Sequence, residues 1–330
     1  MILFYVFLSS FLLSIVLIPI TIKIGTRFCI KKPIKSRTGK PCIGGTGIYI
    51  AFLIAVLFGL FFVRLPGFKL LAIISSSFII MLLGLIDDIK DLRPAVKIIG
   101  ELFSILPLII FGLTTKIVFI PSWLNIFITA IWFLFITNAF NLLDIMDGLT
   151  SGLVIIISLS LGIIAFINKD MFSCVILAAL IGSHIGFLRY NYPPAKVYMG
   201  DTGSLFSGFI LALISINISY APMERKIALL TPILVMSLPI YDTLFLIMMR
   251  IKKRRPIFNK TRDHFALRLI VMGNSVKKSM WIMYRFSIFL AVIAIIVAFS
   301  PNIFGLLAFL AAIFVFIFMG KKVGMVNVYD

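Results

Sequence analysis

The sequence predicts an all-α fold, a polytopic integral membrane helix bundle, on three observations. Hydrophobic residues make up 62% of the 330 residues and charged residues 13%, whereas a soluble domain has roughly 45–50% and 25%. The apolar runs are about 17–23 residues long, enough to cross a hydrocarbon core of roughly 30 Å as helices. The period-two alternation of a membrane β-barrel is absent.

About eleven apolar segments are predicted to cross the membrane, within one domain of residues 1–330. The connecting segments on one side carry 25 of the 31 Lys and Arg residues. Because basic loops stay in the cytoplasm, the N-terminus is expected outside and the C-terminus inside a bacterial plasma (inner) membrane. The predicted spans are residues 2–24, 45–63, 70–86, 95–113, 122–141, 149–167, 171–188, 203–220, 227–249, 281–299 and 302–319.

Most acidic residues lie in or beside the predicted cytoplasmic loops, so an active site is expected on the cytoplasmic face. The net charge of +19 does not indicate a nucleic-acid partner, because the basic residues collect in loops where membrane topology accounts for them. The loops expected to form the active site are 23–44, 87–97, 142–148, 189–202 and 250–280.

The first cytoplasmic loop joins a basic cluster to three glycines in KPCIGGTG. Flexible backbone donors beside basic side chains suit anions, so Arg37 or Lys40 is expected to reach a phosphate. The alternative is a basic membrane anchor followed by a glycine-rich helix start.

Residues 85–94, LIDDIKDLRP, place two adjacent carboxylates directly after the third span. Asp87 and Asp88 repel one another unless a cation holds them, which indicates Mg²⁺ or a positively charged partner. The alternative is an exposed acidic loop that pairs with its own basic residues. Glu101, inside the fourth span, is expected to be a buried hydrogen-bonding residue without a chemical role.

The chain is organised around residues 138–149, NAFNLLDIMDGL. If the apolar run continues as a helix, Asp144 and Asp147 share one face. Asn138 and Asn141 then extend the same polar stripe at three-residue steps. Such a stripe is typical of a site for a cationic or cation-bridged ligand, and a polar network between helices is the alternative.

Two further segments carry polar residues at the same membrane edge. In NYPPAKVYMGDTGSL the paired prolines stop one helix, and Asp201 opens the next, either as a helix cap or as part of a phosphate site at a helix N-terminus. The last loop holds His264 among basic residues, where a solvated side chain is the alternative to a functional one. Asp242, inside the ninth span, is expected to find its partner on another helix.

The order of these motifs resembles the polyprenyl-phosphate N-acetylhexosamine-1-phosphate transferases over nearly the whole chain. The matching segments are KPCIGG, LIDDIKDLRP, NAFNLLDIMDGL, NYPPAKVYMGDTGSL, PIYDTL and the loop that contains His264. The resemblance implies that undecaprenyl phosphate and a UDP-sugar give a lipid diphosphate sugar and UMP, with Mg²⁺ or Mn²⁺ as cofactor. It favours UDP-N-acetylglucosamine or a related amino sugar, places the enzyme among membrane lipids, and leaves a homodimer open.

The same resemblance implies roles for individual residues. Asp87 and Asp88 match the catalytic carboxylate pair near the lipid phosphate and the metal, and Asp201 matches the principal Mg²⁺ ligand. The residues matched at the nucleotide and sugar-phosphate pocket are Asn138, Asp144 and Asp147, with Asn141 expected beside them, Asn191 close by, Tyr198 against the uracil and His264 as the first histidine of a histidine motif.

Some positions depart from the family pattern, and two other protein classes fit the sequence less well. Ala266 and Leu267 stand where many members have further histidines, which weakens the match to the branch that uses UDP-N-acetylmuramoyl-pentapeptide. Ile145 replaces the first glycine usual in DGxDG. An intramembrane prenyltransferase would leave the segments around Asp201 and His264 without a purpose. An ion-coupled transporter should carry its decisive acids near mid-membrane.

Overall fold

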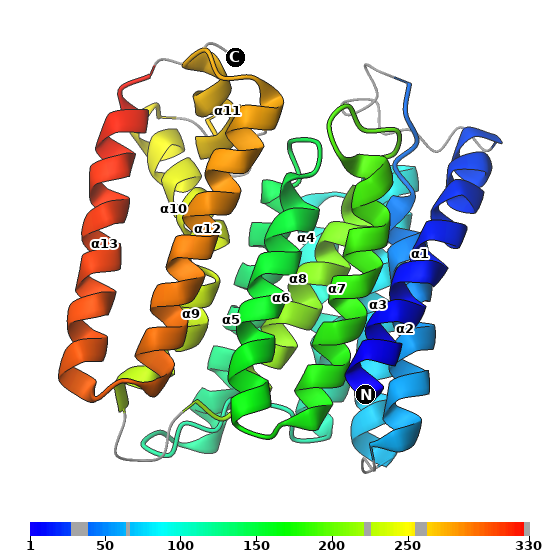
Figure 1. The fold of residues 1–330 in the computed structure, drawn as a ribbon, viewed down its shortest axis with the longest axis horizontal. Helices are drawn as coiled ribbons and strands as arrows, with labels where there is room; N and C mark the ends of the chain where they lie inside the picture. The colour runs from blue at the N-terminus through cyan, green and yellow to red at the C-terminus, as the bar shows by residue number, and fades with distance from the viewer. Residues whose placement is uncertain (28–38, 64–66, 221–225, 255–262, 327–330) are drawn as a thin grey trace.

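The fold is entirely helical in the part of the chain that the structure describes, residues 1–27, 39–63, 67–220, 226–254 and 263–326 of a computed structural model. The helices form a bundle (Figure 1). They are α1 (Ile2–Arg27), α2 (Gly44–Phe62), α3 (Gly67–Lys90), α4 (Pro94–Ile110), α5 (Ser122–Leu143), α6 (Leu149–Ile167), α7 (Met171–Asn191), α8 (Gly200–Asn217), the 3₁₀ helix η2 (Lys226–Leu230), α9 (Thr231–Val235), α10 (Ser237–Lys252), α11 (Phe265–Val271), α12 (Val276–Phe299) and α13 (Asn302–Gly324).

A polytopic membrane bundle is confirmed. Among the described residues, eight helices are long and apolar enough to cross a membrane, and one bent pair would make a ninth. The predicted count of about eleven requires α4 and α8 as well, which have only 17 and 18 residues. The orientation of the bundle in the membrane stays a prediction.

The predicted span 227–249 is wrong as one continuous helix. The segment Lys226–Val235 meets Ser237–Lys252 at an angle of 70°. The bend falls at Met236, just before Pro239, which has no backbone N–H to donate to the carbonyl of Val235. The chain therefore enters α10 in a new direction.

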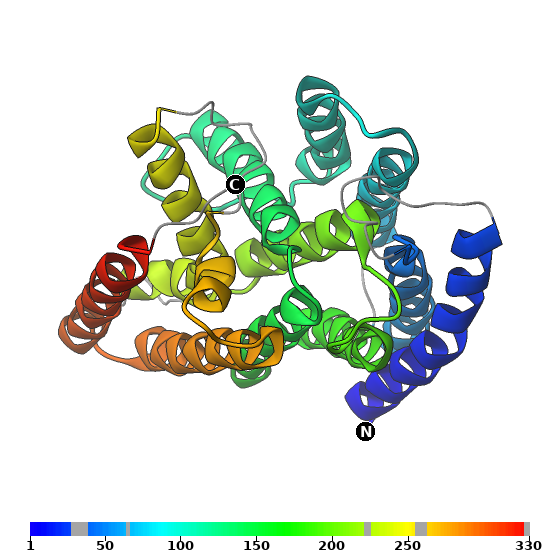
Figure 2. The same cartoon turned by 90° about the horizontal axis from the view of Figure 1, so that it is seen from above.

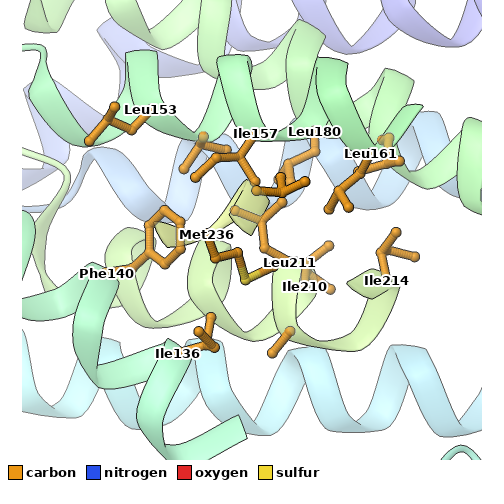
Figure 3. Packing of buried hydrophobic residues seen from close by; sticks show 14 of the residues in the cluster. Ile136, Phe140, Leu153, Ile157, Leu161, Leu180, Ile210, Leu211, Ile214 and Met236 are labelled. Atoms are coloured by element: carbon orange, nitrogen blue, oxygen red, sulfur yellow. The ribbon is translucent and has the colours of Figure 1, made fainter. Parts of the chain in front are cut away.

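Helix α8 lies inside the bundle and packs against α2, α3, α5, α6 and α7 (Figures 1 and 2). Every residue from Gly200 to Ser215 is buried, as expected for a helix that is covered on all sides. Figure 3 shows its apolar residues Ile210, Leu211 and Ile214 among side chains of the surrounding helices, together with Met236. This packing fixes the N-terminus of α8 relative to its neighbours.

Two glycines let α2 and α3 approach the start of α8 closely. A Cβ atom on Gly45 would lie 2.1 Å from the backbone nitrogen of Gly203, and one on Gly84 would lie 2.5 Å from Cα of Thr202. Small residues allow such backbone contacts between membrane helices. Because Gly84 is one turn before Asp88, the contact brings the acidic end of α3 to the N-terminus of α8.

Two helix boundaries affect the site, and the first of them differs from the sequence prediction. Helix α3 continues to Lys90, so Asp87 and Asp88 lie on its last turn and not in a loop. Helix α5 ends at Leu143, so the chain turns through residues 144–148 before α6 begins. Figure 1 shows this turn, the connection from α7 to α8 and α11 at the same end of the bundle.

Candidate active site

Three oxygen atoms from three helices converge on the ammonium group of Lys97 at this end of the bundle. Lys97 Nζ donates to a carboxylate oxygen of Asp87 at 3.1 Å and to one of Asp201 at 3.2 Å. It also donates to the side-chain oxygen of Asn141 at 3.1 Å. The two acids are buried, and the lysine side chain is only 13% exposed. The structure thus brings together Asp87, Asn141 and Asp201, which lie far apart in the sequence.

The connection between α3 and α4 sets the position of Lys97. The second carboxylate oxygen of Asp87 accepts a hydrogen bond from the backbone N–H of Leu92 at 2.7 Å, which closes the turn after α3. Pro94 then starts α4, because its missing N–H costs nothing at the first position of a helix. This geometry places Lys97 in the first turn of α4, opposite Asp87.

Asp88 has a different surrounding from Asp87. One of its carboxylate oxygens accepts the backbone N–H of Asp201 at 2.8 Å. The other accepts the backbone N–H and the hydroxyl group of Thr202 at 2.9 and 2.7 Å. Asp88 therefore caps α8 from a neighbouring helix and satisfies N–H groups that a helix start leaves open. Asp201 itself lies in the first turn of α8, and the N-cap position is taken by Met199, which makes no side-chain cap bond.

Asn138 and Asn141 lie on α5 one turn apart and face α4. The amide nitrogen of Asn141 donates to the hydroxyl oxygen of Ser204 at 2.9 Å, so Asn141 connects α4, α5 and α8. The amide nitrogen of Asn138 donates to one carboxylate oxygen of Glu101. The prediction that Glu101 is a buried hydrogen-bonding residue is confirmed.

The predicted polar stripe of four residues is wrong beyond Asn141. Asp144 follows the last residue of α5, and Asp147 lies in the turn to α6, so the two do not share a helical face. The carboxylate of Asp144 accepts a hydrogen bond from the hydroxyl of Thr150 at 3.3 Å. That of Asp147 accepts the backbone N–H of Ala195 at 2.8 Å. The turn ends in a left-handed glycine conformation, with φ of +76° at Gly148.

Asn191 holds this turn against the α7–α8 connection. Its side-chain oxygen accepts the N–H of Gly148 at 2.9 Å, and its amide nitrogen donates to the carbonyl of Val197 at 2.8 Å. Tyr198 follows, and its N–H donates to the carbonyl of Pro41 at 3.0 Å. The turn after α5 and the α7–α8 connection, both predicted to lie at a nucleotide pocket, are thus hydrogen-bonded to each other through Asn191.

Lys40 lies beside the ring of Tyr198, with its ammonium group 5.8 Å from the ring centre. The two residues predicted from separate segments, one for phosphate and one for the uracil ring, are therefore neighbours. A cation over a tyrosine face at this distance is weakly attractive. Arg37, predicted beside Lys40, lies outside the described residues.

His264 lies in a second polar cluster on α10, α11 and α13. Its Nδ1 atom is 2.8 Å from a carboxylate oxygen of Asp242, whose other oxygen accepts the N–H of Phe265 at 2.8 Å. Asp242 thus finds its partner outside its own helix, as predicted, and His264 is buried. The alternative of a solvated histidine is wrong.

The neighbouring residue Asp263 is held by two basic side chains. Lys253 and Arg268 both donate to the same carboxylate oxygen, Oδ1, each at 2.7 Å. Burial raises the pKa of the Asp263 carboxyl, but the hydrogen bonds and charges of Lys253 and Arg268 outweigh this effect and hold the pKa below its ordinary value. Asp263 is therefore ionised at neutral pH and binds α11 to the end of α10.

Arg268 is completely buried and fastens α11 to the end of α13. Its guanidinium group donates to backbone carbonyls at residues 323, 324 and 326 as well as to Asp263. Carbonyls at a helix C-terminus have no partner within the helix. The arginine satisfies them and fixes the segment that carries His264.

The cluster around Lys97 fits a divalent cation by its donor set. Mg²⁺ in proteins is usually held by one or two carboxylates together with waters and substrate phosphates. Asp87 and Asp201 supply two carboxylates and Asn141 an amide oxygen. Within the described residues there is no group of three or more His, Cys, Asp or Glu side chains arranged to hold a metal ion, so phosphate or water oxygens would have to complete the coordination.

Sequence reasoning missed two residues of these clusters. In the sequence, Lys97 is one of several basic residues in or beside a predicted loop, although it follows the acidic segment by less than three helical turns. Arg268 was hidden in a basic loop of eleven Lys and Arg residues from 250 to 285. Its fully buried position depends on the end of α13, more than fifty residues later in the chain, which no local pattern indicates.

Comparisons with known proteins agree on one family. The sequence profile described as glycosyl transferase family 4 matches residues 70–219, which include Asp87, Lys97, Asn141 and Asp201. A probable undecaprenyl-phosphate N-acetylglucosaminyl 1-phosphate transferase of Bacillus subtilis is 29% identical over 334 residues, covering 97% of this chain and 92% of the relative.

Two further relatives represent two kinds of transferase. A decaprenyl-phosphate N-acetylglucosaminephosphotransferase of Mycobacterium leprae is 30% identical over 75% of this chain and 70% of the relative. A phospho-N-acetylmuramoyl-pentapeptide-transferase of Caldicellulosiruptor bescii is 33% identical over 60% of this chain and 69% of the relative.

Proposed function

The chain belongs to glycosyl transferase family 4, and we propose that it transfers N-acetylglucosamine 1-phosphate from UDP-N-acetylglucosamine to a polyprenyl phosphate in the membrane. The products are a lipid diphosphate sugar and UMP. The similarity to the Bacillus subtilis relative over 97% of the chain supports the sugar and favours undecaprenyl phosphate as the lipid.

The observation that carries the proposal is the convergence of Asp87, Asn141 and Asp201 on Lys97 inside the segment that matches the family. The two substrates bear phosphates that repel each other, and their reaction requires positive charge between them. Acidic and amide oxygens at this point can hold a cation, and the lysine adds a positive charge of its own. The cluster lies at a helix end, where a lipid phosphate at the membrane surface can reach it.

In the proposed reaction, an oxygen of the lipid phosphate attacks the β-phosphorus of the sugar nucleotide. The bond from that phosphorus to the bridging oxygen breaks, and UMP leaves with the electron pair. Bound Mg²⁺, or Mn²⁺ in its place, would neutralise charge on the diphosphate, with Asp87 and Asp201 as its protein ligands. Asp88 acts as a positioning residue, because its carboxylate holds the N-terminus of α8 and therefore Asp201.

We assign the nucleotide end to the joined turn and loop segments. The carboxylates of Asp144 and Asp147 lie on the turn after α5, and Asn191 fixes that turn to the loop that ends at Tyr198. Tyr198 supplies a flat ring for the uracil, and Lys40 lies beside it for a phosphate. His264, which pairs with Asp242 at the start of α11, is assigned to the same active site.

The enzyme is proposed to lie in the plasma membrane with its active site in the cytoplasm, where UDP-sugars are made. The concentration of basic residues at the proposed cytoplasmic segments supports this orientation. Eleven spans follow if α4, α8 and the bent pair each cross the membrane. No nucleic acid has a part in this function, and a homodimer is compatible with it.

A second candidate is the transfer of phospho-N-acetylmuramoyl-pentapeptide, favoured by the Caldicellulosiruptor bescii relative. Ala266 and Leu267 stand where histidines are expected in that branch, and both lie on α11 next to His264. We therefore rank this substrate second.

A substrate panel tests the proposal. Purified protein in lipid or detergent is incubated with undecaprenyl phosphate, Mg²⁺ and one of several radiolabelled UDP-sugars, and UMP and labelled lipid are measured. UDP-N-acetylglucosamine is expected to react, and chelation of the metal is expected to stop the reaction. Turnover only with the muramoyl-pentapeptide nucleotide would favour the second candidate, and transfer of a prenyl group or ion transport alone would contradict both.

A further inference from the structure

Helices α4 and α5 face each other through two polar pairs one turn apart. In the first pair, Lys97 donates to the side-chain oxygen of Asn141 at 3.1 Å. In the second, Asn138 donates to Glu101. Lys97 and Glu101 are four residues apart on α4, so their side chains are neighbours on the same helical face.

The second pair leaves one polar atom without a partner. Glu101 is buried, and its Oε1 atom has no hydrogen-bond partner among the described residues. A buried oxygen without a hydrogen bond is costly and calls for a physical explanation. The adjacent ammonium group could satisfy it, but Lys97 has three donors, and Asp87, Asn141 and Asp201 already receive them.

The place that Lys97 occupies is also the place that a metal ion needs. The ammonium group lies 3.1–3.2 Å from three oxygens, two of them on acids that would bind the metal. A metal ion on the same oxygens would be repelled by the ammonium group at such short range. The lysine in this position therefore opposes metal binding.

We propose that Lys97 is a resident cation which the catalytic metal displaces, and that the displaced ammonium group moves to Oε1 of Glu101. Without metal, the lysine keeps Asp87 and Asp201 from remaining as unpaired buried charges. With metal, it pairs with Glu101 one turn further along α4 and satisfies the oxygen that is otherwise unpartnered. This inference rests on the proposed function only in taking a divalent metal as the cofactor.

The proposal predicts that Lys97 lowers the affinity for the metal and that Glu101 raises it. Lys97 competes with the metal, so its removal should strengthen metal binding. Glu101 stabilises the displaced lysine, so its neutralisation should weaken metal binding. The effect of Glu101 should disappear when Lys97 is absent, because Glu101 acts through that side chain.

The test measures equilibrium Mn²⁺ binding by electron paramagnetic resonance, with purified full-length protein and without nucleotide or lipid substrate. The proteins are wild type, Lys97→Gln, Glu101→Gln and the double variant. Lys90→Gln is the matched control. This substitution removes the same charge, but from an exposed position near the same acids. Thermal unfolding with and without Mn²⁺ gives a second readout.

Lys97→Gln is expected to bind Mn²⁺ about tenfold more tightly or better, a usual size for coupling between two sites. It should also lose thermal stability without metal and gain more from Mn²⁺ than wild type does. Glu101→Gln should bind Mn²⁺ more weakly than wild type, and adding it to Lys97→Gln should change nothing. Lys90→Gln should bind like wild type.

Unchanged or weaker Mn²⁺ binding by Lys97→Gln would overturn the proposal. Glu101→Gln provides an independent arm if Lys97→Gln does not fold, and unchanged or tighter binding by that variant would overturn the proposal as well. A protein that shows the expected binding pattern but releases no UMP would contradict the proposed function alone. A protein that releases UMP without the binding pattern would contradict this inference alone.

Discussion

The carboxylates of Asp87 and Asp88 hold different partners, and this difference separates their functions. Asp87 accepts from the side chain of Lys97 and faces the centre of the cluster. Asp88 accepts three hydrogen bonds from Asp201 and Thr202 at the start of α8. We therefore expect Asp87 to act on substrates or metal, and Asp88 to act through the helix that it caps.

Replacement of Asp88 by Asn should reduce stability and activity together. Asn offers one acceptor oxygen where three donors converge, and it turns an amide group towards N–H groups. The expected loss in the free energy of unfolding is about 1–3 kcal/mol, the cost of an unsatisfied buried hydrogen-bonding group. Thermal unfolding and UMP release measure both effects. Asp91→Asn is the matched control, and an Asp88→Asn protein as stable as this control would contradict the capping role.

Replacement of Asp87 by Asn should reduce activity at every pH. Lipid phosphate loses its second proton near pH ~6 if it behaves like other phosphomonoesters, so a general base would matter mainly below that pH. Because Asp87 is engaged with Lys97 and the backbone of Leu92, we expect a positioning or metal-binding role. The rate of UMP release should stay at least ~100-fold low, a typical electrostatic contribution, as pH rises. Partial recovery at alkaline pH would identify a base instead.

At the scale of elements, α11 is held between α10 and the C-terminal end of α13. Asp242 and Lys253 connect it to α10, and Arg268 connects it to the carbonyls of residues 323, 324 and 326. The position of His264 thus depends on a helix at the end of the chain. Helix α13 contributes to the site although it has only three buried residues, Gly305, Ala312 and Val323.

Removal of the Arg268 side chain should release this connection. Arg268→Ala removes one of the two basic side chains that hydrogen-bond the buried carboxylate of Asp263, and it removes the guanidinium donors at the end of α13. The expected loss in the free energy of unfolding is roughly 3–5 kcal/mol, as for other broken buried ion pairs. Thermal unfolding measures it, with Arg285→Ala as a control because Arg285 is exposed on α12. Equal melting temperatures for the two variants would show that the connection does not stabilise the fold.

At the scale of the whole molecule, we expect the active-site segments to face the cytoplasm. With a background free of native cysteine, Lys196→Cys and Lys116→Cys place one thiol at each end of the bundle, both at exposed positions. In intact cells an impermeant maleimide should label only Lys116→Cys, and Lys196→Cys should react after permeabilisation. Labelling of Lys196→Cys from outside would reverse the orientation.

Composition and hydropathy predict the helical membrane bundle, because twenty apolar residues in a row have few other stable arrangements. The positions of most helices follow from the same signal. The bend at Met236 does not, because it depends on a proline inside an apolar run. An unbroken run of hydrophobic residues gives no sign of such a break in the helix.

The acids of the site were predictable because acids are rare in this chain and cluster at span ends. The different roles of these acids could not be predicted. Whether Asp88 or Asp201 caps α8 depends on the close approach of α3 to α8 at Gly84, which is a contact between distant segments. The same reason hides Lys97, whose importance appears only when Asp87, Asn141 and Asp201 surround it.

The most direct test of the proposed reaction follows the β-phosphate of the donor. The protein is given undecaprenyl phosphate, Mg²⁺ and UDP-N-acetylglucosamine labelled with ³²P at the β-position, and lipid and water phases are separated. Transfer of sugar 1-phosphate predicts that the label enters the lipid and that unlabelled UMP remains in the water phase. Label recovered in soluble UDP, with only the sugar on the lipid, would contradict the account.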